Sequence, residues 1–473
     1  MATPDSAIDA RAATAPELSR SLRSRHVTMI SIGGIIGAGL FVGSSAGIAT
    51  VGPAIIGSYL LAGVVVLMVM RMLGEMATAT PGLGSFTEYV RLGLGTWAGF
   101  LSGWLYWYFW VVVVAIEAIA GAAILHLWIA LPVWTIVLAL MLALTAVNLM
   151  SSRSYGEFEF WFASIKVGAI VAFIAIAGAY ALGLTSPAGA TFANLYVDGG
   201  FAPFGWAAAL AGATTVVFSL CGAEIATIAA AESNESTGVI SRLTSTLALR
   251  ILLFYVLSIL LIVAVVPWRE VAPGSSPFAL ALARTGIPGA ATIMNVIVLT
   301  AVLSCLNSGL YVTSRVLFTL AAREDAPQSL VALSRRRVPW RAILIGSSFG
   351  YLAVLLSVVS PEKAFAFLVN ASGALMIVIY LLACFAHLRL RRQIERTSPE
   401  RLVLRVWLFP WLSWLTIAAM LAVLVAMAFT PSLAAELEAS LVAVALVLLA
   451  YVVRTRARLA ARSGAAASDS GGR

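Results

Sequence analysis

The chain has 473 residues, of which 61% are hydrophobic and 11% are charged, and its mean hydropathy is +0.99. Soluble domains carry about 25% charged and about 45 to 50% apolar residues, so this composition excludes a soluble enzyme. It predicts an all-helical integral membrane protein, because a bilayer span needs roughly 20 apolar residues and the length suffices for about a dozen spans.

Twelve apolar windows predict the membrane helices. In chain order they cover residues 27–48, 52–79, 97–126, 132–150, 158–184, 204–231, 244–266, 287–320, 340–359, 364–388, 406–429 and 434–453. An even number of spans puts both ends of the chain on one side of the membrane. We therefore expect a membrane domain over 27–455 between two cytoplasmic tails.

The tails carry no sign of a further domain. Residues 1–26 are polar and Ala-rich, without the short apolar core and cleavage site of a signal peptide. Residues 456–473 end in a segment rich in Ser, Gly and Ala, which predicts a disordered tail.

Basic residues mark the predicted cytoplasmic side. Of the 30 lysines and arginines, only Arg269, Arg284 and Lys363 fall in loops assigned outside, as expected if inner loops are basic. This distribution argues for a membrane-lipid environment and against a nucleic-acid partner. We interpret arginine clusters such as 389–405 as topology determinants, with binding of anionic lipid as the alternative.

Two helices carry glycine where a simple anchor would have leucine. The first contains Gly33-Gly34-Ile35-Ile36-Gly37-Ala38-Gly39, and the sixth contains Gly212 and Gly222. Glycine permits close helix packing, and it also permits a break that frees backbone donors and acceptors inside the membrane. Because the two helices are five apart, they predict a LeuT-like 5+5 inverted repeat, 27–184 and 204–388, with helices eleven and twelve (406–453) outside it.

The best candidates among the ionisable residues of the apolar spans are Glu117 in helix three, Lys166 in helix five and Glu224 in helix six. Such groups are costly in a bilayer and are candidate functional residues. Burial disfavours a charged lysine, so Lys166 could exchange a proton between conformations or snorkel to the inner interface. Glu224 could contact a substrate, take up a proton or hold a structural network at the second break.

Five further charged residues lie near the inner ends of spans and are assigned to structure or gating: Arg71, Glu75, Glu157, Glu159 and Arg315.

The sequence gives little support for a metal site, a nucleotide-binding loop or an enzyme. Neither the histidines nor the cysteines have metal-ligand spacing, and no Gly-rich stretch is followed by Lys-Ser or Lys-Thr. We expect no metal, no cofactor and no enzyme.

The first-helix motif, Arg25 to Met29 followed by Gly33 to Ser44, is similar to that of a known family. Further similar segments are Tyr155 to Trp161, Gly222 to Ser233, Asn307 to Arg315 and Trp407 to Trp411. In these motifs the chain resembles the amino-acid permeases of the amino acid, polyamine and organocation superfamily. The likeness covers about residues 20 to 455.

The resemblance implies proton-coupled import of an amino acid across the cell inner membrane by alternating access. The amides of Gly37, Ala38 and Gly39 would receive the substrate carboxylate at the positive end of a half-helix. The implied ammonium partners are the carbonyls around Phe218, Ser219 and Cys221, with Glu117 or Glu224 for a longer substrate. Phe218 would gate the site, and Lys166 and Glu224 would serve proton coupling.

The implied substrate is gamma-aminobutyrate, with another neutral or aromatic amino acid as the alternative. Thr28-Met29 and Thr227 to Ser233 favour the first, whereas the glycines at 33 and 39 are more like the general alpha-amino-acid permeases. An amino-acid sensor or channel on the same scaffold is the alternative from a different class. The sequence leaves the oligomeric state open.

Overall fold

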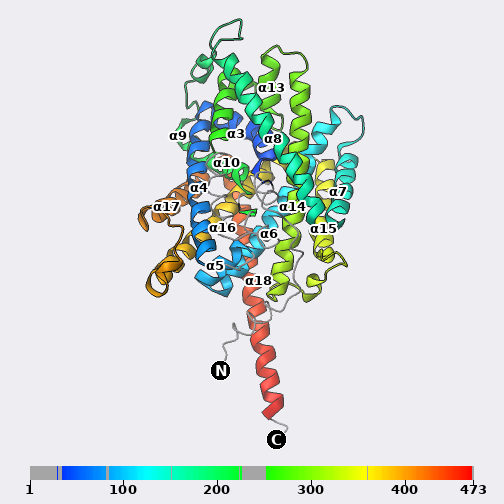
Figure 1. Cartoon of the computed structure of the whole chain (residues 1–473), viewed down its shortest axis with the longest axis vertical. Coiled ribbons are helices and arrows are strands. Elements are labelled where there is room, and N and C mark those ends of the chain that lie inside the picture. The colour runs from blue at the N-terminus through cyan, green and yellow to red at the C-terminus, as the bar shows by residue number, and fades with distance from the viewer. Residues whose placement is uncertain are drawn as a thin grey trace.

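In this computed structural model, the structure describes Met29 and residues 35–80, 85–150, 152–222, 224–225, 252–359 and 361–470. Within these ranges every regular element is a helix (Figure 1). The expected tail 1–26, Gly33, Gly34 and the expected helix boundaries at 231 and 244 lie outside them.

The described residues form α-helices of different lengths and several short helical turns. The α-helices are α3 (Ser44–Val51), α4 (Ile55–Ala79), α5 (Phe86–Leu94), α6 (Thr96–His126), α7 (Val133–Met150), α8 (Ser152–Ala181), α9 (Gly205–Ala211), α10 (Ala213–Leu220), α13 (Pro277–Arg284), α14 (Ala290–Ala322), α15 (Trp340–Val359), α16 (Pro361–Thr397), α17 (Trp411–Ala428) and α18 (Pro431–Ser470). The short turns are η1 (Gly39–Gly43), η2 (Gly52–Ala54), η3 (Phe192–Leu195), η4 (Trp268–Glu270), η5 (Gln328–Val331) and η6 (Pro399–Arg401). An apolar helix without a label spans Leu252–Val265.

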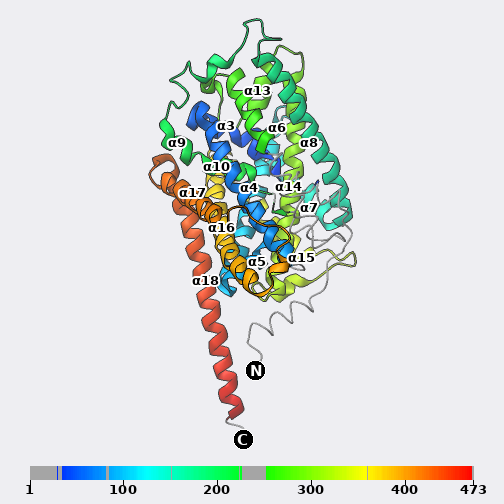
Figure 2. The same ribbon diagram turned by 60° about the vertical axis from the view of Figure 1, so that its left-hand side comes forward.

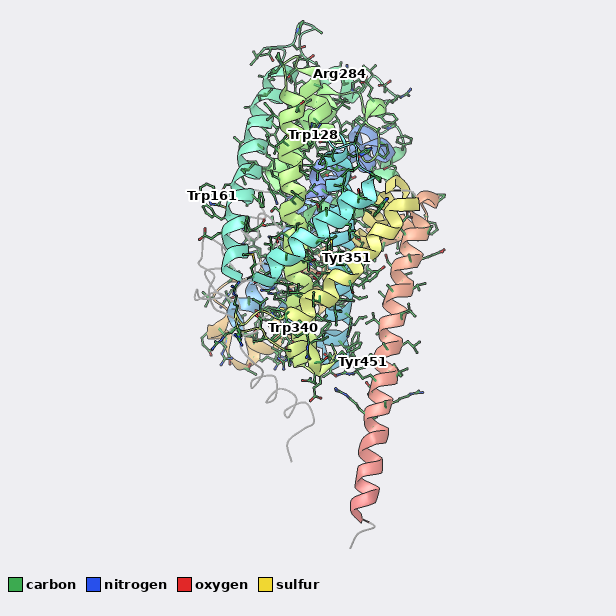
Figure 3. All side chains as sticks on the ribbon, turned by 90° about the vertical axis from the view of Figure 1, so that its right-hand side faces the viewer. Trp128, Trp161, Arg284, Trp340, Tyr351 and Tyr451 are labelled. Carbon is green, nitrogen blue, oxygen red and sulfur yellow. The ribbon has the colours of Figure 1, made fainter. Side chains whose placement is uncertain are left out.

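Many of the helices have the length and apolar composition of membrane-spanning helices. Among the described residues, eight helical segments are long and apolar enough to cross a bilayer, and Gly205–Leu220 and Leu252–Val265 are shorter apolar helices. Trp128 and Arg284 lie toward one end of the bundle, and Trp340 and Tyr451 toward the other (Figure 3). Tryptophan and tyrosine near both ends are typical of the two membrane interfaces. The prediction of an all-helical membrane protein is confirmed.

The structure differs from the apolar windows at several helix ends. The windows missed α5, because this amphipathic helix has only nine residues and begins at a Ser85 cap rather than at an apolar run. Two helices run past their expected ends: α16 continues beyond 388 to Thr397, and α18 continues beyond 453 to Ser470. Residues 456–470, expected in a disordered tail, are therefore helical, as suits their many alanines and arginines. Figure 2 shows α18 projecting from the bundle.

Both glycine-marked helices are interrupted, as expected. The first bends at Ile36 and Gly37 and continues as the π-helical turn η1. The second ends with α10 at Leu220, and Gly222 then adopts φ +118°, a backbone conformation that favours glycine. The interruptions touch, because a Cβ on Gly39 would lie 2.8 Å from the Ser219 Cα. This contact places the freed backbone groups of both helices together in the protein interior.

One end of the bundle is tied by an ion-pair network. The Asp325 carboxylate binds the guanidinium of Arg91 on α5 and, at 2.6 Å, that of Arg454 on α18. Glu88 on α5 pairs with Arg323 at 2.5 Å. The Asp325 side chain is only 3% exposed, so the network joins α5, the end of α14 and α18 across partly dehydrated contacts.

Because the Asp325 carboxylate is buried, its loss should destabilise the protein more than the loss of an exposed carboxylate, Asp198. Asp325→Asn should lower the free energy of unfolding by about 2 kcal/mol, because Arg91 and Arg454 lose the carboxylate they share. Asp198→Asn, which breaks an exposed pair with Arg269, should cost less than about 1 kcal/mol. Unfolding of the purified variants in detergent measures both, and equal losses would contradict the network.

Candidate functional site

A small cavity lies where the two interruptions meet. Its lining comes from the first broken helix, α6, α10 with the residue that follows it, and α14: Ile35, Gly37, Gly39, Phe109, Trp110, Val113, Glu117, Phe218, Cys221 and Cys305. Its volume of about 10 Å³ has room for roughly one water molecule. The cavity must widen before a molecule larger than water can bind.

Glu117 on α6 binds the backbone of the first interruption. The Ala38 amide donates to Oε1 of Glu117 at 2.9 Å and to Oε2 at 3.1 Å. The glutamate is 1% exposed, and Cys305 on α14 also hydrogen-bonds it. The Glu117 carboxylate thus binds the Ala38 amide, which the resemblance assigned to the carboxylate of a substrate.

Gly37 makes this approach possible. A Cβ at this position would lie 2.6 Å from both Glu117 Oε1 and Cys305 Sγ, closer than real Cβ contacts allow. The Gly37 backbone is therefore in direct contact with the acid and the thiol. Only glycine fits here without displacing one of them.

Gly39, Phe218 and Ser219 form the contact between the two interruptions. The Ser219 hydroxyl donates to the Gly39 carbonyl at 2.7 Å. The Phe218 ring lies edge-on to Phe109 with 6.4 Å between ring centroids, and both rings line the cavity. The Phe218 carbonyl accepts from the Cys221 amide at 3.3 Å and, like any carbonyl, has a second lone pair for another donor.

Glu224 lies apart from the cavity lining and binds several donors. The Gly222 amide donates to both of its oxygens at 3.1 Å. The hydroxyls of Tyr106 on α6 and Tyr380 on α16 donate at 3.2 Å and 3.1 Å. Glu224 thereby holds the second interruption against α6 and α16, which is the structural network considered for it.

Lys166 is fully buried on α8 rather than snorkelling to an interface. Its Nζ donates to the Ser304 hydroxyl at 2.6 Å and lies 3.9 Å from Glu159 Oε1. The same serine donates to Glu159. Since Ser304 precedes Cys305 on α14, this group adjoins the one around Glu117.

Sequence reasoning missed the Glu159–Lys166 pair. It assigned Glu159 to a span end, although both side chains are fully buried. The spacing of seven residues, two helical turns, was the signal that could have placed them on one face of α8. Ser304 gave no signal, because a lone serine in an apolar helix is common.

Three other charged residues have structural contacts. Glu75 accepts from His387 at 3.1 Å and from the Val406 amide at 2.5 Å, and Arg71 donates to the Arg405 carbonyl at 2.9 Å. The Arg315 guanidinium lies 3.9 Å from the centre of the Tyr311 ring. Within the described ranges, His, Cys, Asp and Glu form no group of three that could hold a metal ion.

The tight packing at Gly37 predicts a measurable strain. Gly37→Ala should lower the free energy of unfolding by about 1 to 3 kcal/mol, because the added methyl group overlaps Glu117 and Cys305. Gly57→Ala is the matched control, since a Cβ there meets nothing within 4 Å and alanine favours a helix by about 1 kcal/mol. Unfolding in detergent compares the two, and an unchanged Gly37→Ala protein would refute the packing.

Known proteins match this chain over most of its length. The sequence profile described as "Amino acid permease" matches residues 26–459. The gamma-aminobutyric acid permease of Bacillus subtilis (strain 168) is 46% identical, over 95% of this chain and 96% of that protein. The protein of the same name in Escherichia coli (strain K12) is 45% identical, over 88% and 90%.

More distant matches share the scaffold. The aromatic amino acid transport protein AroP of Corynebacterium glutamicum is 40% identical, over 87% of this chain and 89% of that protein. The crystal structure of a mutant manganese transporter of Eremococcus coleocola superposes with a TM-score of 0.61 at 15% identity, over 90% of this chain and 92% of that one, and so shows a common fold. The chain belongs to the amino acid permease family and is a membrane transporter, not an enzyme.

Proposed function

We propose that the chain is a proton-coupled symporter that imports gamma-aminobutyrate across the cell inner membrane by alternating access. Two relatives that carry this substrate in their names match at 45 and 46% identity over nearly the whole chain. The cavity between the interruptions supplies freed amides and carbonyls, the groups that a zwitterion needs once it loses water.

The main support for proton coupling is the hydrogen bond from the Ala38 amide to Glu117. A substrate carboxylate that approaches this amide meets a second carboxylate in an apolar site, where like charges repel strongly. A proton on Glu117 removes the repulsion and gives the acid a donor for the incoming carboxylate. Substrate loading then requires a proton, and release of both resets the site.

Lys166 and Glu159 assist Glu117 in the proposed proton coupling. They form a buried pair of opposite charge that contacts Ser304, the neighbour of Cys305. A proton that leaves Glu117 leaves a negative charge near this pair, which the lysine stabilises. Glu224 is less suited to this role, because four hydrogen bonds from three donors already hold its oxygens.

The ammonium group has its partners at the other interruption. The end of α10 lies beside the cavity, and Phe218 and Cys221 are part of the lining. Both termini face the cytoplasm in this proposal, in line with the arginines after α14 and in the C-terminal parts of α16 and α18. An aromatic alpha-amino acid is the second candidate, supported by the 40% identity to an aromatic amino acid transport protein.

Uptake into proteoliposomes tests the activity. Labelled gamma-aminobutyrate should accumulate above equilibrium under an inward proton gradient, and a protonophore should abolish the accumulation. Unlabelled gamma-aminobutyrate should compete better than phenylalanine or alanine. Preferential competition by phenylalanine would move the substrate to the aromatic class, and flux indifferent to the proton gradient would refute the symporter.

Glu117→Gln separates coupling from binding. The amide side chain mimics the protonated acid, so exchange of internal for external gamma-aminobutyrate should continue, within about threefold of the unmodified protein. Accumulation driven by a proton gradient should fall by about tenfold or more, because the variant carries no exchangeable proton. Glu224→Gln serves as the buried-acid control and should keep its proton-driven accumulation if it folds. Undiminished accumulation by Glu117→Gln would rule out Glu117 as the coupling acid.

A further inference from the structure

A second hollow lies on the surface between α5, α16 and α17, away from the central cavity. Its volume is about 620 Å³, and α16 contacts both of the other helices. Figure 2 shows these three helices grouped on one side of the bundle. We call this hollow the α16 groove and define it by Phe385, Leu388, Arg389, Arg392, Arg396 and Trp414.

Three arginines form the basic half of the groove. Arg389, Arg392 and Arg396 are three and four residues apart, so they share one face of α16, and all three are exposed. Among the residues that the structure describes, no acidic side chain forms an ion pair with any of them. Arg391 shows the contrast, because it faces inward and pairs with Glu75 at 2.7 Å and Glu395 at 2.8 Å.

Aromatic side chains form the apolar half. Phe385 lies one helical turn before Arg389, and its ring is edge-on to Trp414 with 6.2 Å between centroids. Phe385 is 38% and Trp414 45% exposed, an exposure that suits contact with lipid in a membrane helix. Along α16 the groove therefore changes from apolar to basic within three turns, as a bilayer does from acyl chain to headgroup.

We propose that the α16 groove binds an anionic phospholipid. One guanidinium group can donate to two oxygens of a phosphate. Three arginines at one site therefore favour a lipid with a net negative charge over a zwitterionic lipid. An acyl chain of the same molecule lies along Phe385 and Trp414. Basic pockets between membrane helices are a known form of headgroup site. The site is independent of the proposed substrate and of proton coupling.

Native mass spectrometry of the purified protein tests this assignment. The protein in neutral detergent is titrated with phosphatidylglycerol and with phosphatidylcholine of the same acyl chains. Phosphatidylglycerol should bind about tenfold or more tightly than phosphatidylcholine. The variant Arg389→Gln/Arg392→Gln/Arg396→Gln should weaken phosphatidylglycerol binding by roughly 100-fold, since each basic side chain near a headgroup contributes about fivefold.

A matched variant separates the groove from general basicity. Arg335→Gln/Arg336→Gln/Arg337→Gln removes the same charge from an exposed loop before α15 and should keep the phosphatidylglycerol affinity. Equal losses in the two triple variants, or equal binding of the two lipids, would overturn the proposal. An unfolding measurement on each variant confirms that it is folded.

The apolar half has its own test. Phe385→Ala/Trp414→Ala should weaken both lipids and leave their affinity ratio unchanged, because it removes acyl-chain contacts and no charge. Glycerophosphoglycerol, the headgroup without acyl chains, should fail to displace the lipid at equal concentration. Full displacement by this headgroup, or no effect of the aromatic variant, would overturn the lipid in favour of a soluble anion.

Discussion

A backbone amide released from its helix inside a bilayer must find another partner, and the Ala38 amide finds Glu117. The rest of the centre depends on this contact. Gly37 has no side chain, so the acid reaches the backbone. Gly39 also has none, so the backbone of the first interruption packs against the Ser219 backbone of the second. Glu117 and both glycines line the cavity between the interruptions, which has room for roughly one water molecule.

The other buried charges are satisfied within local groups on different helices. Lys166, Glu159 and Ser304 join α8 to α14, whereas Glu224, Tyr106 and Tyr380 hold the second interruption to α6 and α16. The first group pairs opposite charges, whereas the second hydrogen-bonds a buried acid with uncharged donors. Glu117 differs because it lines the cavity, where the Ala38 amide and the Cys305 thiol hydrogen-bond it. The proposed coupling acid is therefore the one of these three buried glutamates, Glu117, Glu159 and Glu224, that lines the cavity.

Sequence patterns predicted the membrane fold and the two interruptions, because apolar windows and glycines in the first and sixth helices carry that information directly. They did not predict α5, whose nine residues are too few for a hydropathy window, or the helical extension of α18. They identified Glu117, Lys166 and Glu224 as buried but not their partners. Those partners are brought together only by tertiary packing, as when Cys305 reaches Glu117 and Tyr380 reaches Glu224.

The proposed coupling depends on one acid, Glu117, which must be protonated when the substrate carboxylate binds. The most direct measurement is proton uptake upon substrate binding, followed with a pH-sensitive dye in weakly buffered detergent solution. At a pH at which Glu117 is ionised in the free protein, addition of gamma-aminobutyrate to the unmodified protein should take up about one proton for each substrate bound, since Glu117 must be neutral in the complex. The same addition to Glu117→Gln should bind substrate without proton uptake. Equal proton uptake by both proteins, or binding without proton uptake by the unmodified protein, would contradict the account.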